Sequence, residues 1–324
     1  MAPHHLAVIE IGFAVLTRHS RLSETPLAMK TCVLLSLLLS MDIGAQLAHP
    51  TKLHVNGVEL HYIEQGKGEP VILLHGGQGD YRSWKAQIDP FSAKYRTISY
   101  SRRYHYPNKN PLVGTNHSAL IEGADLAALI RKLELQPVHL VGTSYGAFAA
   151  LAMALDSPEL VRSLVLAEPP VHQWAKQTPQ GTAEYERFME TVHHPVSKAF
   201  AEEKDALAMQ IFVDQIAGAP RFEKLTDEAK ESILQNSGFF KALMRSSDPY
   251  PNLSKQAVRQ LKIPVLIVGG ENTLELHKIV NKELAGVLPN AKSVTIPNAR
   301  HASSRENPEL FNREVLNFLD QLER

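Results

Sequence analysis

Cysteine is almost absent from this chain, since Cys32 is the only one among 324 residues. One thiol excludes an internal disulfide framework and any metal or iron–sulfur centre built from cysteines. An excess of one charge is also absent, because 34 Lys and Arg residues balance 34 Asp and Glu residues. A balanced chain without runs of like charge lacks the basic footprint of nucleic-acid-binding proteins. The composition, 44% apolar and 21% charged, is that of a globular protein.

The apolar run near the N-terminus, from Cys32 to Leu39, is too short to span a bilayer as a helix. Basic Lys30 precedes this run and small or polar residues up to Ala48 follow it, which is typical of a secretory signal peptide. We therefore predict that residues 1–48 are an extension with a signal peptide and that the protein is periplasmic or secreted. The alternative is a buried first helix or a tail on a cytoplasmic protein.

Short apolar runs alternate with helical segments through residues 49–170 and 262–324. Strand character is found in Lys52–Val55, Val58–Gln65, Pro70–Leu74, Tyr95–Tyr100, Val138–Val141, Val161–Ala167, Pro264–Gly269 and Lys292–Ile296. Helical spacing is found in Ser118–Leu133, Ala147–Leu155, Glu275–Leu288 and Pro308–Leu322. Continuously apolar strands that alternate with helices predict an α/β fold, with a mostly parallel sheet and helices on both faces.

Residues 171–261 depart from this alternation, because they form charged helical segments without a clear strand. This stretch lies between two strand–helix units and follows the strand that ends near Ala167. We predict that it is a helical cap, or lid, inserted into a core formed by residues 49–170 and 262–324. Such a cap would cover the carboxyl edge of the sheet.

The first chemical signal is the G-x-S-x-G pattern of Gly142, Ser144 and Gly146, placed between a strand and a helix. A sharp strand-to-helix turn leaves no room for side chains beside the serine, which explains the two glycines. Such a turn holds a serine in a strained conformation with its Oγ exposed at the helix N-terminus. The pattern predicts that Ser144 is a nucleophile.

The second signal is the glycine-rich turn after the strand Pro70–Leu74, which begins with His75. An oxyanion hole needs two N–H donors that are fixed in place before charge develops. We predict that these are the N–H groups of Gly77 and Tyr145, with Gln78 as a substitute. His75 itself is interpreted as a structural residue of the turn.

The third signal is His301, in a loop just past the last strand. The chain contains 15 histidines, so one His alone means little. The order in which it follows Ser144 matches the Ser, acid, His order of a nucleophile-elbow hydrolase. We predict that His301 is the general base.

With the His75-Gly76-Gly77 turn, the Ser144 elbow and the His301 loop, the chain resembles the α/β-hydrolase superfamily, in its lidded serine esterase and lipase-like branch. The resemblance implies a triad acid, which members usually carry as an Asp shortly after the penultimate strand. Thr273 stands at that place in this chain. Two replacements stand out: Glu168, at the end of the strand Val161–Ala167, which we favour, and Glu271, two residues before Thr273. An acid from residues 171–261, or no acid, also stays open.

A turn with Arg102 and Arg103 replaces the Asp-x-Arg-Gly-His-Gly turn that many relatives carry. Either arginine could bind a carboxylate substrate. The alternative, which we favour, is a loop whose arginines anchor neighbouring backbone.

Together these residues predict a serine hydrolase that transfers an acyl group to water, with an ester or lactone as the first choice of substrate. Amide hydrolysis and carbon–carbon cleavage of diketone-like compounds use the same residues and stay open. We expect a small-molecule substrate, no cofactor, no metal, no nucleic acid and no stable membrane span. A competing hypothesis is a low-turnover ligand receptor or scaffold on the same fold, which the missing Asp at Thr273 favours.

Overall fold

The computed structural model describes residues 49–323, so the predicted signal peptide lies outside the described residues. One sheet is formed by the strands β1 (Thr51–Val55), β2 (Val58–Gln65), β3 (Pro70–Leu74), β4 (Arg96–Ser101), β5 (Val138–Thr143), β6 (Val161–Ala167), β7 (Val265–Gly270) and β8 (Ala291–Ile296). Their order in space is β1-β2-β4-β3-β5-β6-β7-β8. The pairs β1-β2 and β2-β4 are antiparallel. All pairs from β4 through β3, β5, β6 and β7 to β8 are parallel. The predicted α/β fold class is therefore confirmed.

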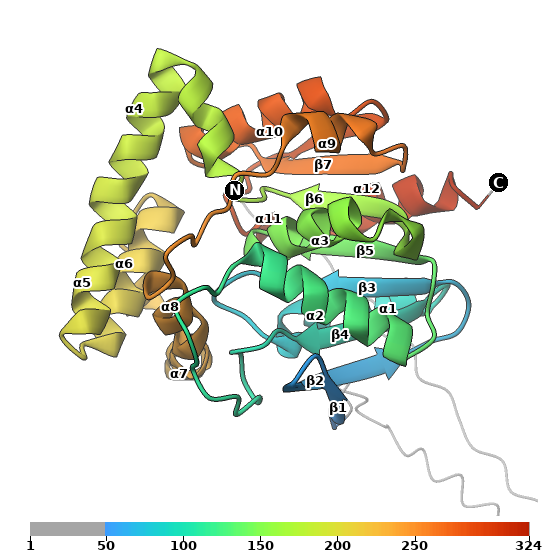
Figure 1. Cartoon of the computed structure of the whole chain (residues 1–324), viewed down its shortest axis with the longest axis horizontal. Helices are drawn as coiled ribbons and strands as arrows, with labels where there is room; N and C mark the ends of the chain where they lie inside the picture. The colour runs from blue at the N-terminus through green and yellow to red at the C-terminus, as the bar shows by residue number, and fades with distance from the viewer. Residues whose placement is uncertain (1–48, 324) are drawn as a thin grey trace, which may run out of the picture. The chain divides into compact units, whose positions relative to one another are not determined.

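The apolar strands separate two hydrophobic cores, one on each face of the sheet. Along β3, Val71 and Leu73 belong to one core, and Ile72 and Leu74 belong to the other. This alternation follows from the strand geometry, in which successive side chains point to opposite faces. The helices α2 (Ala119–Lys132), α3 (Tyr145–Asp156) and α10 (Glu275–Val287) cover one face, and α1 (Lys85–Ser92) and α12 (Pro308–Asp320) cover the other (Figure 1).

The connection between β6 and β7 contains helices and no strand within the described residues. The helices are α4 (Pro179–Phe188), α5 (His194–Ala201), α6 (Asp205–Ala217), α7 (Asp227–Gln235), α8 (Ser237–Met244) and α9 (Lys255–Gln260), with short helical turns between them. Figure 1 shows α4, α5 and α6 beyond the arrowheads of the parallel strands, where the carboxyl ends of β5 and β6 lie. A ligand at this edge of the sheet therefore meets residues of both the core and the insertion.

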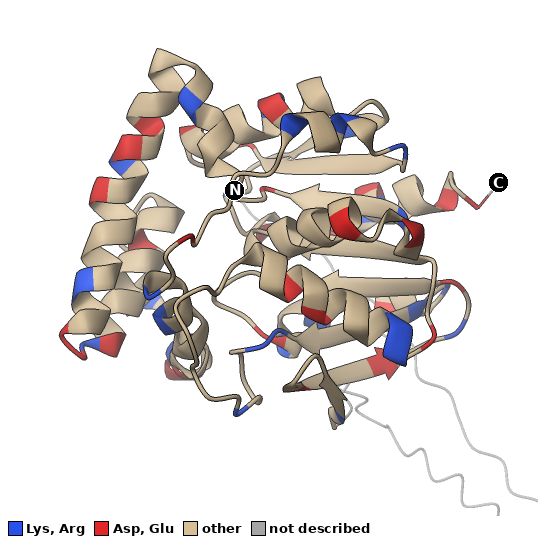
Figure 2. Ribbon diagram, viewed as in Figure 1, with Lys and Arg blue, Asp and Glu red and all other residues tan. Residues whose placement is uncertain are grey.

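Few charged residues lie on the inner strands of the sheet. The strands β3, β5 and β7 carry no Asp, Glu, Lys or Arg, β6 carries only Arg162 near its start, and most charged residues lie on helices and loops (Figure 2). Within residues 49–323, no helix combines the length and the apolar character that crossing a membrane requires.

Candidate active site

Ser144 lies in the turn between β5 and α3 with a φ of 51°, in the left-handed region that side chains rarely adopt. A Cβ at Gly146 would lie 2.4 Å from the carbonyl oxygen of His75, and one at Gly142 would lie 2.6 Å from Cα of Ala147. Both positions therefore require glycine. The backbone strain at this turn is typical of a functional residue that its surroundings hold in place.

Glu168 follows β6 and also has a positive φ, of 51°. Its carboxylate is buried and accepts hydrogen bonds from three groups. The N–H of Gly270 donates to Oε1 at 2.7 Å, and the hydroxyl of Thr273 donates to Oε2 at 2.8 Å. Nδ1 of His301 lies 2.6 Å from the same Oε2. The structure thus places the favoured acid, Glu168, in contact with the predicted base, His301.

A second imidazole, that of His277 in α10, contacts the same carboxylate. Its Nδ1 lies 3.3 Å from Oε2 of Glu168 and 3.2 Å from Oγ1 of Thr273. Its ring stacks on that of His301, with centroids 4.3 Å apart. His277 was not predicted from the sequence. Its local signal is the four-residue spacing from Thr273, which lies just before α10.

The protonation states follow from these contacts. Burial alone would raise the pKa of Glu168, but hydrogen bonds from His277 and His301 outweigh it and hold the pKa well below its ordinary value. Glu168 is therefore ionised. Burial and the charge of His301 lower the pKa of His277, although its hydrogen bond to Glu168 opposes this. A neutral His277 supplies one N–H for the two neighbouring oxygens.

Glu168, His277 and His301 also form a group whose donor atoms all lie within 4.8 Å of one another, close enough for a metal ion. The same atoms already face each other in hydrogen bonds. A hydrogen-bonded cluster of one carboxylate and two imidazoles needs no cation to be satisfied. We therefore interpret it as an orienting network.

Ser144 and His301 line one cavity of about 530 Å³ between the sheet edge and the helical insertion. The core contributes the turn residues Gly76, Gly77, Gln78 and Gly79, and the insertion contributes apolar residues of α6. These apolar residues are Phe212, Val213, Ile216 and Ala217. The cavity has the size and the apolar lining of a small-molecule site.

Gly77, one of the two predicted oxyanion donors, lines this cavity, and so does Gln78, its predicted substitute. Tyr145, the other predicted donor, is the first residue of α3 and directly follows the lining residue Ser144. The first N–H groups of a helix have no partner within the helix, so they can bind an anion. A Cβ at Gly77 would lie 2.9 Å from ring atoms of Phe239 and Phe240. The packing of α8 thus requires glycine at this position.

His75 stabilises the turn, as the sequence analysis expected. Its Nδ1 lies 2.8 Å from the carbonyl oxygen of Gly76, and its Nε2 accepts from the N–H of Arg102 at 3.1 Å. Burial, and then the positive charge of Arg102, lower the pKa of His75 to about 3. A neutral ring with one donating and one accepting nitrogen fits both contacts.

The other candidate residues lie apart from the reacting groups. Glu271 is exposed, and its Oε2 accepts from the N–H of Asn298 at 2.8 Å. Arg102 is buried against Glu122 and donates to the carbonyl oxygen of His75.

Arg103 forms a two-pronged ion pair with Asp125, at 2.8 and 2.6 Å. Neither Arg102 nor Arg103 is among the described residues that line the cavity. This placement favours the alternative interpretation, in which both arginines anchor neighbouring structure.

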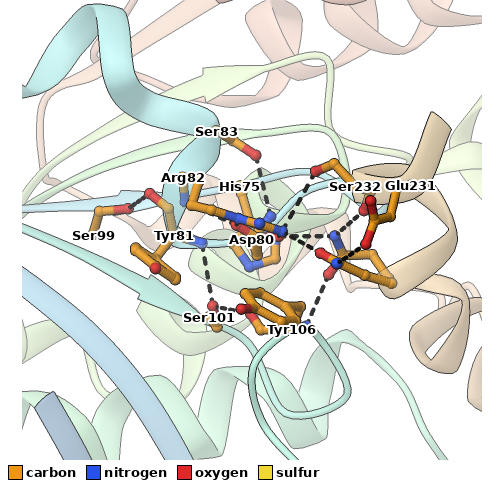
Figure 3. A network of polar contacts seen from close by, with 12 residues as sticks. His75, Asp80, Tyr81, Arg82, Ser83, Ser99, Ser101, Tyr106, Glu231 and Ser232 are labelled. Atoms are coloured by element: carbon orange, nitrogen blue, oxygen red, sulfur yellow. Dashed lines mark hydrogen bonds and ion pairs between the residues drawn. The ribbon is translucent and has the colours of Figure 1, made fainter. Parts of the chain in front are cut away.

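The insertion is attached to the oxyanion turn by a polar network around Asp80, which Figure 3 shows. Asn236 donates to Oδ2 of Asp80 at 2.9 Å and accepts from the N–H of Tyr106 at 2.9 Å. Arg82 bridges Asp80 and Gln235 with contacts of 2.7 and 2.8 Å. Core and insertion therefore share a buried carboxylate directly beside the turn of Gly77.

A family model described as alpha/beta hydrolase fold matches residues 69–308. The chain belongs to this family. It is 29% identical over 265 residues to BpoC of Mycobacterium tuberculosis, provisionally named a non-heme bromoperoxidase, covering 81% of this chain and 97% of that protein. It is 26% identical to a 2-hydroxy-6-oxononadienedioate/2-hydroxy-6-oxononatrienedioate hydrolase of Pseudomonas putida, covering 81% and 92%.

Solved structures of this α/β-hydrolase family superpose well. A thermophilic esterase from Thermogutta terrifontis matches with a TM-score of 0.69 and 20% identity, over 86% of this chain and all of that one. At this identity the match supports the fold alone. The relatives thus agree on the hydrolase fold and differ in the chemistry that their names state.

Proposed function

We propose that this α/β-hydrolase is a serine hydrolase that transfers an acyl group to water. The observation that carries the proposal is the 2.6 Å contact between His301 Nδ1 and Glu168, on a cavity that Ser144 also lines. A carboxylate at Nδ1 fixes the imidazole in the tautomer whose Nε2 can accept a proton. Glu168 then replaces the Asp that relatives carry at the position of Thr273.

In the proposed mechanism, Ser144 Oγ attacks a carbonyl carbon while His301 Nε2 takes its proton. The N–H groups of Gly77 and Tyr145 stabilise the oxyanion. His301 returns the proton to the leaving group, and an acyl-enzyme remains on Ser144. Water, deprotonated by His301, attacks this ester and restores the serine. Glu168 stabilises the imidazolium in both steps without taking its proton.

We infer an ester or lactone as substrate, because the cavity wall from α6 is apolar and the reacting groups are those of acyl transfer. A carbon–carbon hydrolase is the second candidate. It is favoured by the likeness to the 2-hydroxy-6-oxononadienedioate hydrolase, over 92% of that relative's length. Both reactions use Ser144 and His301, so variants of these residues do not distinguish them. Turnover of a panel of esters, lactones and diketone-like compounds does.

The test is reaction with a fluorophosphonate probe, read by peptide mass mapping, beside turnover of p-nitrophenyl butyrate. We expect labelling on Ser144 and loss of both signals in Ser144→Ala. Folded wild-type protein without labelling and without turnover would contradict the proposal and favour a ligand receptor.

A further inference from the structure

The cavity beside Ser144 carries an excess of positive charge on one wall. Its charged lining residues are Arg221, Arg300, Arg305 and Glu306. Nη1 of Arg221 lies 2.8 Å from Oε1 of Glu306, and Nη1 of Arg300 lies 3.8 Å from the same oxygen. One carboxylate is thus shared by two guanidinium groups.

Arg305 has no such partner. Within residues 49–323 its guanidinium makes no hydrogen bond and no ion pair. The side chain is accessible to solvent, yet desolvation by the surrounding protein lowers the pKa of Arg305, and the charge of Arg221 lowers it further. Glu306 opposes this only in part. Arg305 is a cation held beside another cation.

Three guanidinium groups and one carboxylate leave two positive charges uncompensated on this wall. Apolar side chains of Phe212, Val213 and Ile216 also line the cavity. A charge in such a site is stabilised when an anion arrives, because attraction is stronger where water is partly excluded. Arginine is suited to carboxylates, since its planar fork donates two parallel hydrogen bonds.

We propose that Arg305, with Arg221, binds a carboxylate of the substrate, so that the natural substrate is a carboxylate-bearing ester or lactone. This inference rests on the proposed serine hydrolase function, since it names the substrate class of the same cavity. Arg305 lies in α11 (Ser303–Glu306), four residues after His301. The proposed anion site and the proposed base therefore lie on the same segment, between β8 and α12.

The test compares two esters that differ only in a terminal carboxylate: p-nitrophenyl valerate and mono-p-nitrophenyl adipate. We expect wild-type protein to have the higher kcat/KM for the adipate half-ester. In Arg305→Gln the ratio of the two kcat/KM values should fall about tenfold, mainly through KM, as expected for a lost charged hydrogen bond. The matched control is Arg313→Gln, an exposed arginine of α12 that pairs with its neighbour Glu314. It should keep the wild-type ratio.

A second measurement does not depend on the variant. Adipate should inhibit valerate hydrolysis by wild-type protein competitively, and neutral adipamide should not. An unchanged ratio in folded Arg305→Gln, or equal inhibition by adipate and adipamide, would overturn the carboxylate site. Fluorophosphonate labelling of Ser144 in the same samples separates this outcome from failure of the proposed function, in which labelling is lost too.

Discussion

The hydroxyl of Thr273 donates a 2.8 Å hydrogen bond to Oε2 of Glu168, the oxygen that also faces His301. The resemblance to the α/β-hydrolases implies an Asp at the place of Thr273. In the proposed triad the carboxylate instead follows β6, and the hydroxyl of Thr273 orients it. A second carboxylate at residue 273 would face Glu168 in a buried site, where like charges repel.

This arrangement predicts unequal effects for the two candidate acids. In Glu168→Gln the imidazole loses its carboxylate, and kcat should fall by roughly three to four orders of magnitude, as when a triad acid becomes an amide. Glu271→Gln is the matched control, because that side chain contacts only the Asn298 backbone among the hydrogen bonds of the described residues. Steady-state turnover of p-nitrophenyl butyrate measures both variants. The reverse ranking would move the acid to Glu271.

The orienting role of Thr273 predicts a smaller loss. Thr273→Val keeps the shape of the side chain and removes the donor to Glu168, so kcat should fall about tenfold with little change in KM. Thr295→Val, on the exposed side of β8, is the control and should keep wild-type turnover. A Thr273→Val variant with wild-type kcat would show that the hydrogen bonds from Gly270 and His301 orient Glu168 sufficiently.

The sequence predicted the inner strands β3, β5, β6 and β7 well because they are buried on both faces and therefore mostly apolar. Val161–Ala167 was placed residue for residue, and Tyr95–Tyr100 differs by one position from Arg96–Ser101. The Ser144 elbow was recognisable because backbone contacts, with Ala147 at Gly142 and with the His75 turn at Gly146, require both glycines of the pattern. These features depend on local sequence, which pattern analysis can see.

The contacts of His277 and Arg305 could not be predicted in the same way. His277 matters because the fold brings it to Glu168, 109 positions earlier in the numbering, and because its ring stacks on His301. Arg305 stands out only because, within residues 49–323, no carboxylate forms an ion pair with its guanidinium. Burial and pairing of charges depend on which elements meet, and a single sequence does not reveal this for residues far apart.

The lowered pKa of His75 predicts a pH-dependent stability. The folded pKa, about 3, lies below the unfolded value near 6.5, so the unfolded chain binds more protons between them. Stability should therefore fall as the pH drops below about 6.5, by about 2 kcal/mol from this group between pH 7.5 and pH 5. The buried carboxylates of lowered pKa, such as Glu168, keep their contribution in this interval.

Urea unfolding at both pH values measures this effect. On going from pH 7.5 to pH 5, the free energy of unfolding of His75→Gln should fall by about 2 kcal/mol less than that of wild-type protein. His54→Gln, on the exposed edge strand β1, is the control and should show the wild-type difference. A His75→Gln variant with the full wild-type pH dependence would assign it to other buried histidines, whose pKa values are lowered as well, such as His105 and His172.

Asn236 of the insertion donates a hydrogen bond to the carboxylate of Asp80 beside the oxyanion turn. We therefore predict that Asn236 holds the insertion onto this turn. Burial would raise the pKa of Asp80, but hydrogen bonds from Arg82 and Asn236 hold it below the ordinary value. Asn236→Ala removes a buried donor to a charged oxygen and should lower the free energy of unfolding by about 2 kcal/mol. Because Phe239 and Phe240 follow on α8 and pack on Gly77, the KM for p-nitrophenyl butyrate should rise as well.

Asn252→Ala is the matched control for this variant. Asn252 is exposed in the same insertion and makes no side-chain hydrogen bond within residues 49–323. It should leave both the unfolding free energy and KM unchanged. Loss of stability in Asn236→Ala with an unchanged KM would mean that the bond to Asp80 supports the fold without positioning the insertion. If KM rises together with the loss of stability, the shape of the cavity depends on this single buried hydrogen bond. The reason is that the oxyanion turn and α8 would then move apart.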